Sequence, residues 1–244
     1  MKAHWTCSVG LVWFVIAAHD GRAEYVFSPL PGNGNRSGPD IFLYTSSEAP
    51  AGRVQEVHAA SDFVSSAEPV LLITELSYSA PSWSGRMPID VTLPSIEIRL
   101  STTQKNPDGL SINFADNVGA DQTVVYSGPL HFYETETETY DIHVSITPFR
   151  YDPAAGNLLV DVFNYAPLLS RRDPDWVVDS AERFGDSVSR LGGRANSVSG
   201  GFSTFGLMTR FTYTPVPEPS TWALFGIGIV GLSIARWKFA PRKR

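Results

Sequence analysis

The sequence of 244 residues has very little cysteine and lysine. Its single cysteine, at position 7, cannot form a disulfide within the chain, so the fold must be held by apolar packing. Between residues 24 and 219 lysine occurs only at position 105. The chain therefore lacks the basic surface of a nucleic-acid-binding domain, and we expect no nucleic acid among its partners.

Charged residues make up only 18% of the chain, whereas glycine and proline occur 20 and 18 times. This balance favours strands and turns over helices. The apolar fraction of 43% is sufficient for one large domain or two small ones and excludes a disordered chain. The longest uncharged runs lie near the two ends, which indicates targeting signals there.

The N-terminus has the pattern of a secretory signal peptide. An apolar stretch over residues 5–18 follows a basic residue and precedes a polar step. Gly21 and Ala23 are the small residues that a signal peptidase accepts at its cleavage site. The sequence predicts a signal peptide over residues 1–23, removed by cleavage before Glu24.

At the C-terminus, two prolines flank an acidic residue in the tripeptide Pro217, Glu218 and Pro219. An uncharged run of 16 residues, 220–235, follows. As a helix it would be about 24 Å long, slightly less than the hydrocarbon core of a bilayer. Flanking basic side chains can snorkel and extend the span, which predicts one transmembrane helix over about 221–240.

The chain ends in a basic tail, which consists of Arg236, Lys238, Arg242, Lys243 and Arg244. By the positive-inside rule this tail lies in the cytoplasm, and the bulk of the protein lies on the other side of the membrane.

The tripeptide, the short apolar helix and the basic tail together resemble the PEP-CTERM sorting signal, over residues 215–244. The resemblance implies that an exosortase cleaves near the tripeptide and passes the protein to the cell surface or extracellular matrix of a bacterium that makes exopolysaccharide. The prolines fit this role because they keep the backbone extended for a protease. An ordinary C-terminal anchor with a proline-rich hinge is the alternative.

Short apolar runs with turn clusters between them fill residues 24–214, which predicts an extracellular antiparallel β-sandwich of jelly-roll type. A change of phase at Pro94 predicts a bulge or kink on an edge strand. Residues 58–64 predict a short helix. Residues 166–201 predict a long surface connection with one helical turn around 180–184. We expect strands over 41–44, 70–78, 89–93, 96–100, 124–126, 130–133, 142–146, 158–163 and 207–213.

Residues 50–165 and 207–215 also resemble a domain common in exported PEP-CTERM proteins. Its activity is not assigned, so the resemblance implies localisation and fold and no catalytic residue. The segments that carry it include Arg53–Val57, Leu93–Ile96, Pro107–Leu110, Asn117–Asp121 and Gly156–Val162.

Catalytic motifs are scarce in this region, and we expect no enzyme activity. His58, His131 and His143 show no metal-binding spacing. Gly185–Val188 has the Gly-Asp-Ser start of a lipase-type motif, but it lies in a polar connection without a preceding strand, and G-x-S-x-G is absent. A secreted hydrolase is therefore the third hypothesis, after the two given below.

A sugar platform is one binding site that the sequence allows. Flat aromatic rings stack on sugar faces, and Trp83 on a predicted loop is the best candidate, with Tyr78 and Trp176 beside it. The alternative for Trp83 is that it covers the end of the sandwich core.

Calcium is the other ligand that we consider. Asp116, Asn117 and Asp121 offer hard oxygen ligands, although no calcium-loop spacing is present. Residues 24–219 carry 12 Lys and Arg against 24 Asp and Glu, a net charge of −12, which attracts cations or simply keeps the domain soluble. We expect no cofactor, with calcium as the alternative.

The sequence thus predicts an exported surface or matrix protein with a structural or adhesive role. The alternative is a carbohydrate-binding module for extracellular polysaccharide. The predicted partners are signal peptidase, exosortase and, before processing, the membrane.

Overall fold

The computed structural model describes residues 23–29, 36–41, 52–64, 69–79, 89–135, 140, 142–166, 177–182 and 185–216. Strands dominate, and three short 3-10 turns are the helical elements in this part of the chain. The strands are β1 Glu24–Ser28, β2 Arg36–Ile41, β3 Gly52–His58, β4 Leu71–Tyr78, β5 Ile89–Thr103, β6 Thr123–Glu134, β7 Ile142–Tyr151, β8 Asn157–Asn164, β9 Val177–Glu182, β10 Val188–Arg194, β11 Gly201–Ser203, β12 Phe205–Leu207 and β13 Thr209–Pro215. The turns are η1 Ala60–Asp62, η2 Phe114–Asn117 and η3 Pro153–Ala155.

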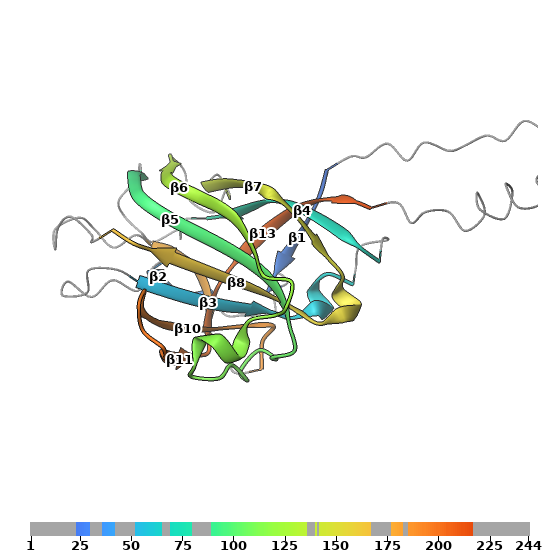
Figure 1. The fold of residues 1–244 in the computed structure, drawn as a ribbon. Coiled ribbons are helices and arrows are strands. Elements are labelled where there is room, and N and C mark those ends of the chain that lie inside the picture. The colour runs from blue at the N-terminus through green and yellow to red at the C-terminus, as the bar shows by residue number, and fades with distance from the viewer. Residues whose placement is uncertain are drawn as a thin grey trace, which may run out of the picture.

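Two antiparallel sheets form the body of the molecule (Figure 1). One has four strands in the order β1-β13-β4-β7, and the other has six in the order β11-β10-β3-β8-β5-β6. A smaller sheet has the order β12-β9-β2. The all-β, antiparallel prediction is confirmed, and the jelly-roll connectivity stays a prediction.

The core lies between the two larger sheets, because each contributes the apolar residues of its inner face. On β7, buried and exposed residues alternate along most of the strand, as the sequence pattern requires. Ile98 and Val160 of the six-stranded sheet belong to the same buried cluster as Ile73 and Phe211 of the four-stranded sheet. Burial is therefore shared by both sheets, and neither can form its apolar face without the other.

The segment between β5 and β6 covers part of the outer face of the six-stranded sheet, where Phe114 packs with Leu191 in a second apolar cluster. A buried polar network holds this cover in place. The Nδ2 of Asn117 donates to Oε1 of Gln55 at 3.0 Å, and the Nε2 of Gln55 donates to Oδ2 of Asp161 at 3.0 Å. All three side chains are at most 1% exposed, and each makes its hydrogen bonds to protein groups in place of water.

The bulge predicted at Pro94 is confirmed, since the β5–β6 register shifts between Leu93 and Ile96. Its strand is not at the sheet edge, however, because β8 pairs with β5 from Ile96 onward. The single strand β5 replaces the two strands expected at 89–93 and 96–100.

Two predicted segments differ from the structure. Residues 58–64 contain the end of β3 and the 3-10 turn η1 instead of a helix. The connection expected over 166–201 contains β9 and β10, and residues 180–182 lie in β9 instead of a helical turn. The sequence pattern did not predict these strands, because polar residues weaken the apolar alternation there.

Residues 1–22 of the predicted signal peptide and the whole predicted transmembrane helix fall outside the described ranges. Among the residues that the structure does describe, no helix has the length and apolar character needed to cross a bilayer.

A substitution at Gly119 measures how tightly the segment between β5 and β6 packs against the sheet. A Cβ added there would overlap the carbonyl oxygen of Thr102, which is backbone and cannot move aside cheaply. We expect Gly119→Ala to lower the free energy of unfolding by about 2 kcal/mol. At Gly201 the nearest atom to an added Cβ is 4.0 Å away. Gly201→Ala is therefore the matched control, and equal urea midpoints for the two variants would contradict the packing described.

Candidate functional site

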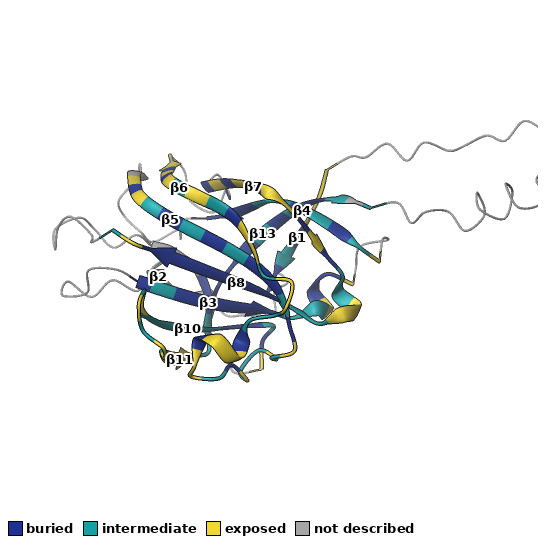
Figure 2. Ribbon diagram, in the orientation of Figure 1, coloured by how far each residue is buried: buried dark blue, intermediate teal, exposed yellow. Residues whose placement is uncertain are grey.

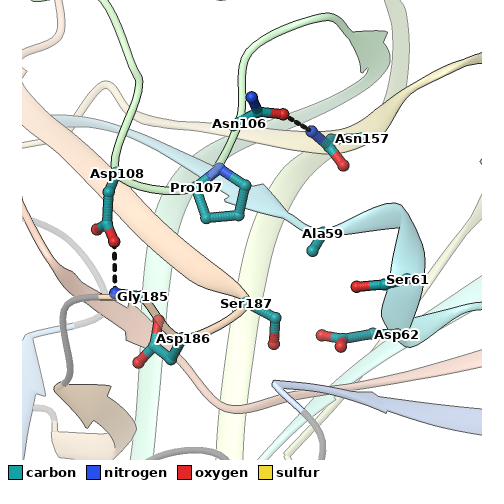
Figure 3. Close-up of a pocket in the computed structure, with 10 residues that line it drawn as sticks. All are labelled: Ala59, Ser61, Asp62, Asn106, Pro107, Asp108, Asn157, Gly185, Asp186 and Ser187. Atoms are coloured by element: carbon teal, nitrogen blue, oxygen red, sulfur yellow. Dashed lines mark hydrogen bonds between the residues drawn. The ribbon is translucent and has the colours of Figure 1, made fainter.

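A polar cleft of about 700 Å³ opens at the end of the sandwich where η1 lies (Figure 3). Its walls come from η1, the turn that follows β5, the start of β8 and the turn that precedes β10. Oxygen-bearing side chains dominate the lining, and they are Ser61, Asp62, Asn106, Asp108, Asn157, Asp186 and Ser187.

Asn157 joins three walls of the cleft. Its Oδ1 accepts a hydrogen bond from the backbone N–H of Ala60 at 2.8 Å. Its Nδ2 donates to the carbonyl oxygen of Lys105 at 2.8 Å and to Oδ1 of Asn106 at 3.1 Å. This one side chain therefore fixes η1 and the turn after β5 relative to the start of β8.

Asp108 connects the remaining wall. Its Oδ2 accepts a hydrogen bond from the backbone N–H of Gly185 at 2.7 Å (Figure 3). Its own N–H donates to the hydroxyl of Ser189 at 2.8 Å. The φ of Asp108 is 60°, a left-handed conformation that aspartate tolerates better than most side chains.

Oδ1 of Asp108 in the lining is buried and has no hydrogen-bond partner among the described residues. Oγ of Ser187 is also buried, and it lies beside the carboxylate of Asp62, to which it can donate. The carboxylate, amide and hydroxyl oxygens of the lining are hydrogen-bond acceptors, so the cleft is suited to a ligand rich in donors.

Asp62 connects the cleft to the interior. Only 2% of it is exposed, and its Oδ2 accepts a hydrogen bond from the buried hydroxyl of Ser28 at 2.6 Å. Burial raises the pKa of Asp62 above its usual value, and the nearby hydroxyls of Ser187 and Ser28 reduce that rise.

His58 lies behind Ser28 in the interior. Its Nδ1 is 3.0 Å from Oγ of Ser28, and its ring lies edge-on to Phe211 with centroids 5.0 Å apart. Because the Ser28 hydroxyl donates to Asp62, Nδ1 must donate to Ser28. Its Nε2 is buried with no partner among the described residues, and burial lowers the pKa of His58 to about 3.

This cluster differs from a hydrolase triad. In a triad the histidine lies between the nucleophile and the acid, whereas here Ser28 lies between His58 and Asp62, and all three are buried. Ser187 of the Gly-Asp-Ser segment does face the cleft. The expectation that no strand precedes it is wrong, because β9 does. A strand, β10, follows it, so the strand-to-helix turn of a nucleophile elbow is missing.

The predicted sugar platform is only partly within the described residues. Tyr78 is 1% exposed and belongs to the main core, so the expectation of an accessible ring is wrong at this position. It lies on the inner face of β4, and an alternating pattern alone does not say which face is inside. Trp83 and Trp176 fall outside the described residues.

The three proposed calcium ligands serve separate local roles. Asp116 accepts from Ser111 and Asn113 within its own turn. Asp121 accepts from the backbone and hydroxyl of Thr102. Asn117 is buried in the network beneath the cover, as described above.

Asp116 and Asp121 do line a second cleft, of about 520 Å³, together with Lys105. In the described part of the chain, no three His, Cys, Asp or Glu side chains are grouped so as to hold a metal ion.

Of the predicted processing residues, Ala23 and Glu24 are described, and Glu24 begins β1, where its Oε2 accepts from the hydroxyl of Tyr213 at 3.0 Å. Gly21, the tripeptide Pro217–Pro219 and the basic tail fall outside the described ranges.

Comparison with known protein families shows that residues 215–237 match the PEP-CTERM protein-sorting motif. The match confirms the resemblance seen in the sequence. It implies an exported protein with an exosortase as its processing partner. Searches of the curated proteins and of the solved structures give no match to the chain.

The buried His58 predicts acid sensitivity. As the pH falls below the ordinary histidine pKa of 6.5, His58 takes up a proton in the unfolded chain. In the folded chain His58 takes up that proton only near pH 3. We expect the free energy of unfolding to fall by about 2 kcal/mol between about pH 7.5 and about pH 5 through this residue. Asp62 acts in the opposite direction, because its raised pKa lets the folded chain take up a proton first.

The measurement is urea unfolding of the parent and of His58→Asn at both pH values. Asparagine keeps a donor toward Ser28 but does not titrate. Its unfolding free energy should change less over this range than that of the parent, and the same loss in both proteins would exclude His58 as the cause.

Proposed function

We propose that this chain is an exported, exosortase-sorted protein whose β-sandwich has a non-catalytic adhesive role at the cell surface or in the extracellular matrix. The matched sorting motif carries this proposal. It begins at residue 215, where β13 ends, so processing near the tripeptide would leave every strand of the sandwich intact. A predicted signal peptide before β1 completes the export route.

For the ligand we propose a neutral, hydroxyl-rich segment of extracellular polysaccharide, bound in the cleft. The observation in favour is the oxygen-rich lining, in which carboxylate, amide and hydroxyl side chains offer hydrogen-bond acceptors. Carboxylate and amide side chains bind sugar hydroxyls through such acceptors. The carboxylates of Asp62, Asp108 and Asp186 in the lining disfavour an acidic polymer.

The described lining of the cleft contains the three carboxylates of Asp62, Asp108 and Asp186, and no histidine, cysteine or lysine. A secreted hydrolase is a less favoured proposal. Sugar stacking on Trp83 and calcium as a cofactor are also less favoured.

The sorting role predicts that alanine at Pro217, Glu218 and Pro219 blocks processing. Without the prolines the backbone can continue as helix, so the exosortase loses its extended substrate. We expect the variant to stay in the membrane fraction at unprocessed mass, measured by immunoblot of fractionated cells. A chain with alanine at the exposed residues Thr123, Ser127 and Ser145 is the control. Normal surface delivery of the first variant would contradict the proposal.

The cleft predicts a steric block by a large side chain at its exposed rim. Ser61 is exposed and lines the cleft, so Ser61→Trp should reduce retention on the neutral polysaccharide at least about tenfold while the fold is kept. Ser145→Trp, on the exposed face of β7, should leave retention unchanged. The measurement is co-sedimentation of the purified protein with insoluble polysaccharide. Equal retention of both variants would place binding elsewhere.

A further inference from the structure

An exposed apolar patch lies at one edge of the six-stranded sheet, and none of its residues lines the cleft. It consists of Ile112, Val198 and Phe202, which are 60%, 77% and 39% exposed. We call it the β11 patch, because Phe202 lies in β11 and Val198 in the turn that leads to it. Figure 2 shows the exposed residues around β11 and η2 at this edge.

The patch is built from two segments far apart in the sequence that bond to each other. The N–H of Phe114 donates to the carbonyl of Val198 at 3.1 Å, and the N–H of Gly200 donates to the carbonyl of Ile112 at 2.9 Å. Asn113 and Ser199 form a β-bridge between these two bonds. The apolar side chains are therefore held in a fixed arrangement by the backbone, which favours a preformed contact surface.

Charge is absent from both segments. Residues 109–115 and 195–209 contain no Asp, Glu, Lys or Arg, whereas residues 24–219 as a whole carry a net charge of −12. A second copy of the chain is repelled by most of such a surface and least by this part of it. A basic partner would be drawn to the acidic surface elsewhere, so the absence of charge favours a second copy here.

The patch adjoins an open strand edge. β11 pairs with β10 on one side, and among the described strands no other pairs with it. The opposite edge of the sheet, β6, runs beside β7 of the four-stranded sheet (Figure 1). Unpaired backbone groups on an edge strand accept another strand, and a two-fold axis places identical strands antiparallel.

The rim of the patch also suits identical partners. Arg194 at the end of β10 and Asp116 in η2 are both exposed and carry opposite charges. A two-fold contact must be self-complementary, and the two uncharged segments have one exposed residue of each charge close to them in the sequence, which is compatible with that requirement.

We propose that the β11 patch is a self-association surface, through which two copies of this chain pair edge to edge by β11. Such a pair carries two clefts. If the clefts bind a polymer, the second binding event is intramolecular and retention is strengthened without any new contact. The pairing itself does not depend on the identity of the ligand.

The test measures the mass of the exported protein, purified after processing, by sedimentation equilibrium from about 1 µM to about 500 µM. We expect a reversible dimer whose dissociation constant rises at least about tenfold in Val198→Glu, because a carboxylate then replaces an apolar side chain in the contact and has to be desolvated. Tyr133→Glu, at a 54% exposed position on β6, is the matched control and should not change the dissociation constant.

A parent that stays monomeric at every concentration would overturn the proposal, as would equal weakening by Val198→Glu and Tyr133→Glu. Loss of polysaccharide retention in Val198→Glu without a change in mass would assign the patch to the polymer and would also overturn it. Urea midpoints verify that the variants fold. If Val198→Glu does not fold, Ile112→Glu, at a 60% exposed position, gives the same comparison.

Discussion

The apolar contact between the four-stranded and six-stranded sheets is the constraint on which the rest of this structure depends. A chain with one cysteine has no intrachain disulfide to limit the entropy of its unfolded state, so burial must supply the stability. Ile98 and Val160 on one sheet and Ile73 and Phe211 on the other show how completely both inner faces are used. With the sheets fixed in this way, their connecting turns are fixed too, and the cleft is formed by those turns.

Polar side chains at the ends of the strands hold the turns in place. Asn157 bonds to η1 and to the turn after β5, and Asp108 connects that turn to the one before β10. On the outer face, Asn117, Gln55 and Asp161 attach the cover over the second apolar cluster. The proposed binding cleft is therefore a rigid product of the fold, and preorganisation of this kind lowers the entropy cost of holding a flexible polymer.

Features that depend on a short stretch of sequence could be predicted, whereas features formed by segments far apart in the sequence could not. Alternation revealed β7, and the phase change at Pro94 revealed the β5 bulge. The tripeptide and apolar run near the C-terminus revealed the sorting motif. Strands β9 and β10 were missed because polar residues and glycines interrupt their alternation. The cleft was missed because Asp62, Asp108 and Ser187 are far apart in the sequence, and Tyr78 was misplaced because a pattern does not identify the inner face of a strand.

We propose that an exported, non-catalytic sandwich holds a neutral polysaccharide in the cleft beside η1. The most direct measurement is a titration of the ¹⁵N-labelled protein with a soluble fragment of that polysaccharide, followed by backbone amide chemical shifts. We expect saturable shifts that are largest at Asn106, Asp108, Gly185 and Ser187, with the fragment recovered unchanged afterwards. Shifts confined to the outer sheet faces, no saturable shifts, or a cleaved fragment would contradict it.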